Sequence, residues 1–304
     1  MYVPTPSTPV ILVDVGVSGV EVFAKLESQG PTGSIKDRTA RSMVDAAERD
    51  GRLAPGGVII EASSGNTGIA LSSIGAERGY RVEIICNPRV TDEKIELLEQ
   101  LGATVHILDD SLLEMDYHYL QFGADLARER GGVFLNQYDN PANPYIHEHE
   151  TGPELLSQLG HPPDVFVAGA GTGGTITGVA RSLRNAGAGT RIVLADPVGS
   201  IYAHAHATGE LSDPEPYQVE AVGQAERMLP PNIALDLIDE ALSIPDTESF
   251  DAARNAASQG ISCGPSSGLA LAAAVRIAAT LPNGSTIATI LPDGAERYLS
   301  RGPR

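Results

Sequence analysis

Hydrophobic residues follow two patterns along this chain: short continuous apolar runs, and longer stretches in which an apolar residue recurs every third or fourth position. The first pattern is typical of a parallel strand buried on both faces, and the second is typical of an amphipathic helix. We predict strands over residues 10–13, 20–24, 58–62, 82–86, 105–108, 132–135, 164–168, 192–196 and 286–291. We predict helices over residues 38–50, 69–78, 91–101, 113–130, 147–159, 176–185 and 247–259, and a further alanine-rich helix that opens with residues 263–268.

These strands and helices alternate, and the alternation predicts an α/β fold with doubly wound, mostly parallel sheets. A segment rich in turn-forming residues at 136–144 marks the crossover between two domains. We therefore expect an N-terminal α/β domain over residues 1–142 and a C-terminal α/β domain over residues 143–304. We expect the first ~30 residues to pack on the C-terminal domain, and residues 200–226 to be loop-rich.

The composition excludes several classes of function. The 304 residues carry a formal net charge of −18, which disfavours nucleic acid as a partner because phosphate backbones bind basic surfaces. No apolar run reaches the length of a membrane span, and the N-terminus lacks the basic and apolar segments of a secretion signal. Neither the two cysteines, Cys86 and Cys263, nor the histidines show metal-ligand spacing. We expect a cytoplasmic protein with no membrane segment, structural disulfide or metal.

The strongest candidate for ligand binding is the glycine- and threonine-rich loop at residues 171–175, between a predicted strand and a predicted helix. Backbone N–H groups and hydroxyls at a helix N-terminus bind phosphate, and the helix dipole adds to the attraction. The loop lacks the lysine of a triphosphate-binding P-loop, and it does not open the first strand–helix–strand unit as a dinucleotide-binding glycine motif does. The alternative is a tight turn that only packs the helix on the sheet.

Three other positions are candidates for chemistry. A polar loop at residues 63–68 precedes a predicted helix and suits a substrate carboxylate, although a serine-capped helix has the same pattern. Ser266 and Ser267 begin another helix, where capping is the simpler interpretation. Lys36 lies in the first turn of a helix, where the macrodipole disfavours a cation. That position favours a nucleophilic or Schiff-base lysine, and a solvated lysine paired with Asp37 is the alternative.

Considered together, the motifs resemble those of a known enzyme family. They are residues 33–38 (GSIKDR), 63–68 (SSGNTG), 171–175 (GTGGT) and 263–268 (CGPSSG), with further matches at 137–144, 196–200 and 293–298. Their order and spacing are similar to those of the pyridoxal-phosphate enzymes of fold type II, in the cysteine synthase and cystathionine β-synthase branch. The resemblance covers nearly the whole chain and implies two α/β domains of the tryptophan synthase β-like type.

The resemblance also implies pyridoxal 5'-phosphate as the cofactor. Lys36 would hold the cofactor as a Schiff base and carry the substrate's α-proton, Asn66 would bond its 3'-oxygen, and Ser266 would face its ring nitrogen. The residues that would bind its phosphate are Gly171, Thr172, Gly173, Gly174 and Thr175. The residues that would bind the substrate are Ser63, Ser64, Thr67, Gln137 and Gly223.

The reaction implied is β-replacement. A leaving group departs from Cβ of a serine derivative (O-acetylserine, O-phosphoserine or serine), and a nucleophile then adds to the resulting aminoacrylate. We expect a cysteine synthase-like homodimer that acts on small molecules. Cystathionine formation from serine and homocysteine, a 2,3-diaminopropionate-type synthesis and a serine or threonine dehydratase are the alternatives.

One segment departs from the family pattern. Residues 219–223 read VEAVG where the β-synthase branch has VEGIG, so Ala221 replaces a glycine and restricts the backbone. A changed second substrate would account for this difference. The non-enzyme alternative is a ligand sensor that retains a degenerate site; the intact Lys36, Asn66 and Ser266 argue against it.

Overall fold

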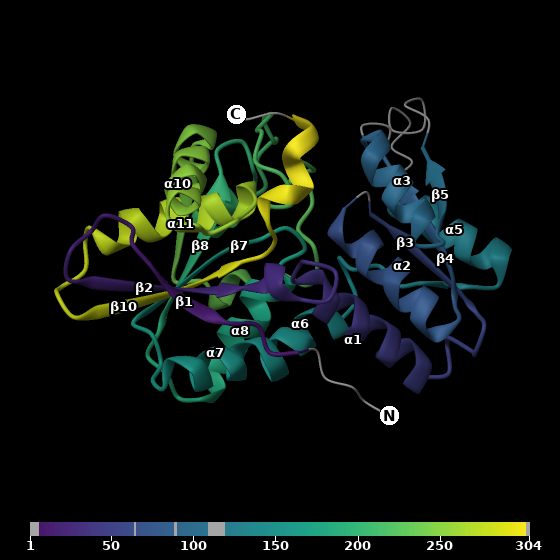
Figure 1. The fold of residues 1–304 in the computed structure, drawn as a ribbon, viewed down its shortest axis with the longest axis horizontal. Coiled ribbons are helices and arrows are strands. Elements are labelled where there is room, and N and C mark those ends of the chain that lie inside the picture. Colours follow the sequence, from purple (N-terminus) through teal and green to yellow (C-terminus); the bar gives the residue numbers. More distant parts are fainter. Residues whose placement is uncertain (1–5, 64, 88–89, 109–118, 302–304) are drawn as a thin grey trace. The chain divides into compact units, whose positions relative to one another are not determined.

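The computed structural model describes residues 6–63, 65–87, 90–108 and 119–301 (Figure 1). The chain divides into two compact units. The N-terminal unit contains Lys36–Asn143, and the C-terminal unit contains Pro6–Ile35 together with Pro144–Arg304. Each unit has a mostly or wholly parallel sheet with helices around it. The predicted α/β fold class is therefore confirmed.

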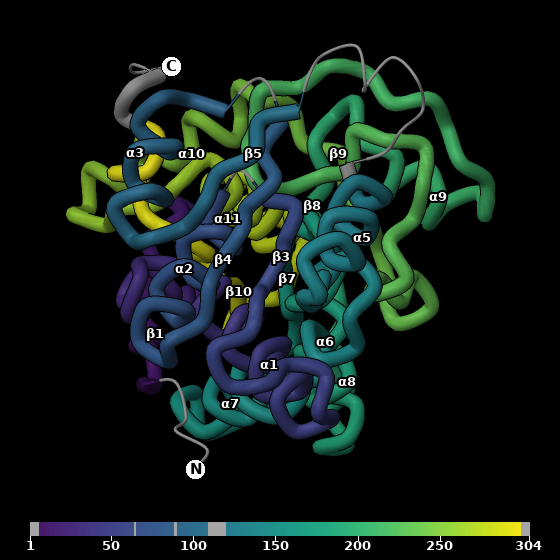
Figure 2. The backbone as a smooth tube through the Cα atoms, turned by 90° about the vertical axis from the view of Figure 1, so that its right-hand side faces the viewer, coloured from purple at the N-terminus to yellow at the C-terminus, as the bar shows by residue number. Residues whose placement is uncertain are grey.

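The N-terminal unit contains a parallel sheet in the order β5-β4-β3-β6, of which β5, β4 and β3 lie side by side in Figure 2. Its strands are β3 (Val58–Ala62), β4 (Arg81–Cys86), β5 (Thr104–Ile107) and β6 (Val133–Phe134). Its helices are α1 (Lys36–Arg49), α2 (Asn66–Arg78), α3 (Asp92–Gln100) and α5 (Tyr119–Arg130). Successive side chains of β3 face opposite ways, so Ile59 packs with α1 and α2 while Val58 and Ile60 pack with α5.

The C-terminal unit contains a sheet in the order β1-β2-β10-β7-β8-β9, parallel except where β1 meets β2. Its strands are β1 (Val10–Val13), β2 (Val20–Leu26), β7 (Val165–Gly169), β8 (Arg191–Pro197), β9 (Glu240–Ile244) and β10 (Ser285–Leu291). Its helices are α7 (Gly152–Leu159), α8 (Gly174–Asn185), α9 (Tyr202–Thr208), α10 (Asp246–Ser258) and α11 (Pro265–Ala278), and α6 (Ala142–Ile146) contains the division between the units. Phe166 of β7 packs with α7 and α8, whereas Val167 packs with α11.

The sequence pattern fails at several elements. Residues 200–226 contain helix α9, which is short and rich in alanine and histidine, and β9 was not predicted because its polar-interrupted sequence has a single buried residue. The predicted helix over 147–159 is a π-helical turn, His147–Thr151, followed by α7, since Pro153 has no N–H to continue the α-helical hydrogen bonding. The helix predicted over 113–130 is seen from Tyr119 onward, and its first residues lie outside the described ranges.

Neither a membrane span nor a metal cluster is found among the residues that the structure describes. No helix there is long and apolar enough to cross a membrane. Within the same residues, no group of His, Cys, Asp and Glu side chains is arranged to hold a metal ion.

Candidate active site

The loop at 171–175 joins β7 to α8 in the C-terminal unit. Gly173 precedes the helix with φ of +82°, no side chain caps the helix, and its first turn carries no acidic residue. The first N–H groups of an α-helix have no partner within the helix. The N-terminus of α8 therefore presents N–H groups, and the positive end of its dipole, to an anionic ligand.

Close backbone contacts hold this loop in place. A Cβ on Gly173 would lie 2.5 Å from Cβ of Ile233 and 2.6 Å from its Cα, so no side chain fits there. A Cβ on Gly171 would lie 3.2 Å from the carbonyl oxygen of Ala221. The hydroxyl of Tyr202 donates a hydrogen bond to the carbonyl of Gly171. The glycines are thus required by packing as well as by the positive φ at Gly173.

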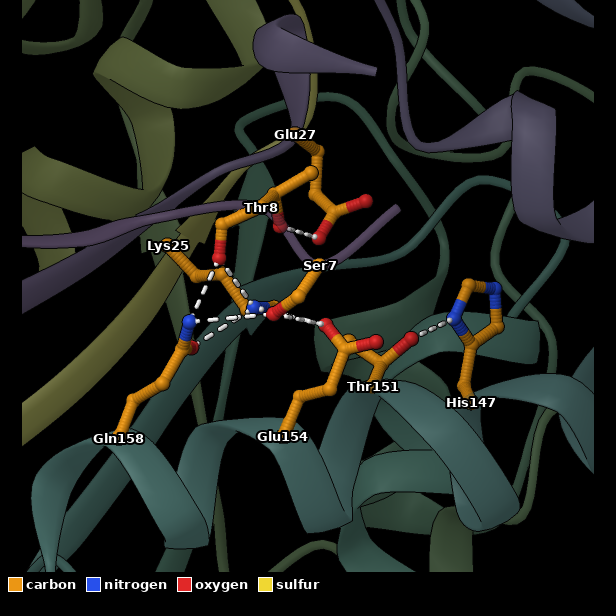
Figure 3. A network of polar contacts seen from close by, with 8 residues as sticks. All are labelled: Ser7, Thr8, Lys25, Glu27, His147, Thr151, Glu154 and Gln158. Atoms are coloured by element: carbon orange, nitrogen blue, oxygen red, sulfur yellow. Dashed lines mark hydrogen bonds and ion pairs between the residues drawn. The ribbon is translucent and has the colours of Figure 1, made fainter. Parts of the chain in front are cut away.

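His147 supports the same loop from the π-helical turn. The side chain of His147 is fully buried, with Nε2 3.3 Å from the hydroxyl of Thr175 and Nδ1 2.9 Å from the hydroxyl of Thr151. The second contact is drawn in Figure 3. From the sequence the histidines were considered only as metal ligands, so the role of this residue was missed. No sequence pattern marks it, because the contact joins segments that are 28 residues apart.

Ser266 lies in the first turn of α11, which begins without a side-chain cap. Its hydroxyl is buried and has no hydrogen-bond partner within the described residues. A buried polar group without a partner is costly, so this hydroxyl indicates a site that a polar ligand atom completes. The capping interpretation of Ser266 is therefore not supported.

The segment at 219–223 lies against the loop. The N–H of Gly223 donates to the carbonyl of Ala170 at 2.7 Å, and Val222 packs where a Cβ on Gly169 would be 2.5 Å away. Gly223 has φ of +78°, and Ala221 has φ of +62°, a conformation that costs an L-residue about 1 kcal/mol or more. The departure from the family motif at Ala221 is thus a point of backbone strain beside the loop.

In the N-terminal unit, the loop at 63–68 leads from β3 into α2. The N-cap residue of α2, Gly65, forms no side-chain capping bond, and the first turn of α2 carries no acidic residue; the same holds for α8 and its N-cap residue Gly173. The hydroxyl of Ser63 accepts from the N–H groups of Gly65 (3.3 Å) and Gly68 (3.4 Å). Ser64, also predicted to bind the substrate, lies outside the described residues.

The N-terminal unit brings two further predicted substrate residues, Thr67 and Gln137, and the predicted cofactor residue Asn66 to the same helix start. Asn66 and Thr67 are the first residues of α2. The hydroxyl of Thr67 donates to Oε1 of Gln137 at 2.7 Å, and Nε2 of Gln137 lies 3.5 Å from the carbonyl of Ala62. Ser63, Asn66, Thr67 and Gln137 therefore meet at the N-terminus of α2, where an anion is favoured.

The chain has only three lysines, Lys25, Lys36 and Lys94. The side chain of Lys25 is fully buried, and its amine donates to Oε1 of Gln158 at 2.8 Å and pairs with Glu154 at 3.0 Å (Figure 3). Lys94 lies on α3, whereas Lys36 is the first residue of α1. Lys25 is committed to this buried ion pair, which leaves Lys36 and Lys94 as candidates for covalent chemistry.

The cysteines are poor nucleophiles. Burial raises the pKa of Cys86 to about 11 and that of Cys263 to about 12, and the carboxyl of Asp293 adds to the second shift. Both thiols are free and neutral near pH 7. The cysteines therefore do not compete with Lys36 and Lys94 as candidates for covalent chemistry.

Comparison with known proteins shows the family to which the chain is similar. The profile of the family described as "Pyridoxal-phosphate dependent enzyme" matches residues 4–293. The chain is 38% identical to a cystathionine beta-synthase of Apis mellifera over 92% of this chain, and 35% identical to a cysteine synthase of Staphylococcus aureus over 96% of this chain. The crystal structure of O-ureido-L-serine synthase matches with a TM-score of 0.88 at 35% identity, over 97% of this chain and 91% of that chain.

These relatives differ in length. The chain spans 56% of the Apis mellifera protein but 93% of the Staphylococcus aureus protein. The likeness to the longer relative is thus confined to about half of its length.

Proposed function

Because the chain belongs to the pyridoxal-phosphate dependent enzymes, we propose that it catalyses β-replacement on a serine derivative in the manner of a cysteine synthase. The donor would be O-acetylserine, O-phosphoserine or serine, and the product a β-substituted alanine.

The hydroxyl of Ser266, which has no hydrogen-bond partner among the described residues, carries this proposal. It is a buried polar atom in the same unit as the N-terminus of α8, which supports the proposal that this unit would hold both the ring nitrogen and the phosphate of the cofactor. The bound cofactor supplies an electron sink that labilises bonds at Cα and Cβ of an amino acid. A serine hydroxyl does not hold a proton on the ring nitrogen as a carboxylate would, which suits β-replacement better than transamination.

The phosphate would be bound by the N–H groups and hydroxyls of residues 171–175, the loop that close packing holds in place. Asn66, the first residue of α2, would donate to the 3'-oxygen of the cofactor. Nζ of Lys36 would form the covalent bond to the cofactor and afterwards take the α-proton of the substrate.

The substrate carboxylate would be bound at the start of α2. Ser63, Thr67 and Gln137 are gathered there, and we include Ser64 from the sequence motif. Gly223, which has a positive φ and no side chain, would line the path of the substrate.

A second candidate function is the synthesis of cystathionine from serine and homocysteine. It is supported by the 38% identity to cystathionine beta-synthases and by the VEAVG segment. The likeness to O-ureido-L-serine synthase adds an oxygen nucleophile to the compounds worth testing, beside the ammonia that a 2,3-diaminopropionate synthase would use.

We also propose a homodimer in the cytoplasm, with domain limits at 1–142 and 143–304 and with the first ~30 residues packed on the C-terminal domain. The dimer and the domain limits are supported by the family resemblance. The compartment is supported by the two free, buried cysteines, which fit a reducing environment.

The test is to add each donor separately to the cofactor-loaded protein with sulfide, homocysteine, ammonia or hydroxyurea, and to identify products by mass spectrometry. We expect one donor to change the visible absorption of the cofactor and to give a β-substituted alanine. Lys36→Ala should lower turnover by about 1,000-fold or more and change the absorption of the bound cofactor, whereas Lys94→Ala should retain both. Equal losses in the two variants, or no response to any donor, would reject the proposal.

A further inference from the structure

Glu61 is a carboxyl that the proposed reaction does not use. It lies on β3, two positions before Ser63, and its exposed fraction is 0%. Among the described residues it has no ion-pair partner, and all the hydrogen bonds that it accepts there come from backbone N–H groups. A buried charge normally has a charged or metal partner, so an isolated buried carboxyl needs another explanation.

Its contacts connect it to the substrate-binding residue Gln137. Oε1 of Glu61 accepts from the N–H of Ala62 at 3.1 Å and from the N–H of Gln137 at 3.5 Å. The backbone N–H of Asn136 also bonds to this carboxyl. Asn136 has φ of +51°, so the chain enters Gln137 through a left-handed turn that directs consecutive N–H groups to one acceptor.

Two buried oxygens of this cluster lack a hydrogen-bond donor among the described residues. Oε2 of Glu61 and Oδ1 of Asn136 are both buried, and neither has a partner in the described part of the chain. Both oxygens are acceptors if Glu61 is ionised, whereas a protonated Oε2 is a donor. A proton on Oε2 therefore supplies the kind of group that the cluster lacks.

The charged groups around Glu61 do not offset an ionised form. Glu61 lies on the same face of β3 as Ile59, the face that packs on α1, α2 and α3. The titratable residues on those helices, on β4 and on the loop at 135–141 are Lys36, Asp37, Arg38, Arg41, Asp45, Glu48, Arg49, Glu77, Arg78, Arg81, Glu83, Cys86, Asp92, Glu93, Lys94, Glu96, Glu99, Tyr138 and Asp139. None of them shifts the titration of Glu61, and Arg78 pairs with Asp45 and Glu48 instead.

We propose that Glu61 is a positioning residue for the substrate carboxylate: as a neutral acid it holds the backbone of Gln137 and keeps negative charge away from the start of α2. This inference rests on the proposed function, because it assumes that Ser63, Thr67 and Gln137 bind a carboxylate. An ionised Glu61 would repel that carboxylate from two residues away, in a buried region where charges are poorly screened.

The pKa of Glu61 is raised in the folded protein. Burial, opposed by the backbone hydrogen bonds, raises the pKa of Glu61 from 4.5 to about 8. The folded protein therefore holds this proton up to about pH 8, while the unfolded chain loses it near pH 4.5. The resulting stabilisation is complete below pH 4.5 and is lost as the pH rises through about 8. Substrate affinity should fall as the pH passes through the same upper limit.

The first test compares wild type, Glu61→Gln and Glu99→Gln by kinetics from pH 6.5 to 9. Gln is a neutral isostere, and Glu99 is an exposed acid on α3 in the same unit. We expect the KM for the donor to rise with pH on the order of tenfold more in wild type and Glu99→Gln than in Glu61→Gln, with kcat similar in all. The donor's own amine titrates equally in every variant, so only the difference between variants counts. Parallel KM profiles would overturn the inference.

The second test needs no substrate. The side-chain carboxyls are labelled with ¹³C, and their NMR titration is followed in the cofactor-free protein, with Glu61→Gln identifying the signal and Glu61→Met as a second neutral variant if the first does not fold. We expect one glutamic acid signal that titrates near pH 8 and is missing in the variant. A Glu61 signal already ionised at pH 6 would reject the inference and leave the proposed function standing. In the kinetic test, absence of any response of the wild type to the donors would reject both.

Discussion

The two strand-to-helix loops, at 63–68 and at 171–175, have the same local structure but are fixed by different kinds of contact. Each follows a buried parallel strand and precedes a helix that has no side-chain cap and no acidic first turn. The 171–175 loop is fixed mainly through its backbone, with Ile233 and Ala221 filling the space where side chains would be. The 63–68 loop is fixed by side-chain hydrogen bonds, from Ser63 to its own backbone and from Thr67 to Gln137.

This difference matches what each loop would bind. A phosphate that belongs to a resident cofactor needs a site that does not rearrange, and close backbone packing provides one. A substrate carboxylate enters and leaves in every turnover, and side-chain hydroxyls and amides can exchange their partners for it. We infer that the helix N-terminus at 171–175 forms a rigid anion site, whereas the helix N-terminus at 63–68 forms an adaptable one.

The largest effect should come from a side chain forced into the backbone-fixed loop. In Gly173→Ala, the new Cβ would meet the backbone of Ile233 at a positive φ, so the loop must move. We expect a loss of about 3 kcal/mol in the free energy of unfolding and cofactor binding weakened by about 100-fold or more. Urea denaturation and a fluorescence titration with the cofactor would measure the two effects.

The matched control is Gly187→Ala. Gly187 also has a positive φ, of +70°, but nothing lies within 4 Å of the place that a Cβ would take. It should cost only about 1 kcal/mol and leave cofactor binding unchanged. Similar losses of stability and of cofactor affinity in both variants would show that the positive φ of Gly173, and not its close packing, fixes the loop.

A smaller and different effect is expected in the side-chain-fixed loop. Thr67→Val keeps the shape of the residue and removes the hydroxyl that donates to Gln137. We expect the KM for the donor to rise about tenfold, equivalent to about 1.4 kcal/mol, with cofactor affinity unchanged. Steady-state kinetics and the cofactor titration separate these quantities. Ser72→Ala, which removes a hydroxyl from the same helix, should change neither by more than about twofold.

A loss of cofactor affinity in Thr67→Val comparable to that in Gly173→Ala would contradict the division of roles between the loops. The division would be sharpened if the two variants changed separate quantities, one the affinity for the cofactor and the other the KM for the donor.

The loops themselves could be located from the sequence because each depends on local signals. A continuous apolar run such as Val58–Ala62 marks a buried strand, and a cluster of glycine and serine before an amphipathic run marks the helix start. Weakly patterned elements such as α9 and β9 escaped prediction, since one is a short Ala/His helix and the other has a single buried residue. The sequence carries no comparable local signal for either.

The supporting residues could not be predicted for a different reason. His147 contacts Thr175, and Glu61 contacts Gln137, across 28 and 76 residues respectively. A lone histidine or a glutamate at the end of a strand has no periodicity or spacing that indicates such a partner. Likewise, the sequence places Ser266 at a helix start, but only the structure shows that its hydroxyl is buried and lacks a partner within the described residues.

The smallest effect is expected at Ala221, whose carbonyl lies against Gly171. Ala221→Gly relieves a positive φ of +62°, so the free energy of unfolding should rise by about 0.5–1 kcal/mol in urea denaturation. Ala225→Gly, at an exposed alanine without a positive φ, should give no gain. If packing alone fixes the 171–175 loop, cofactor affinity should not change. A weaker affinity in the more stable Ala221→Gly variant would instead show that strain in the neighbouring segment holds Gly171 in its binding conformation.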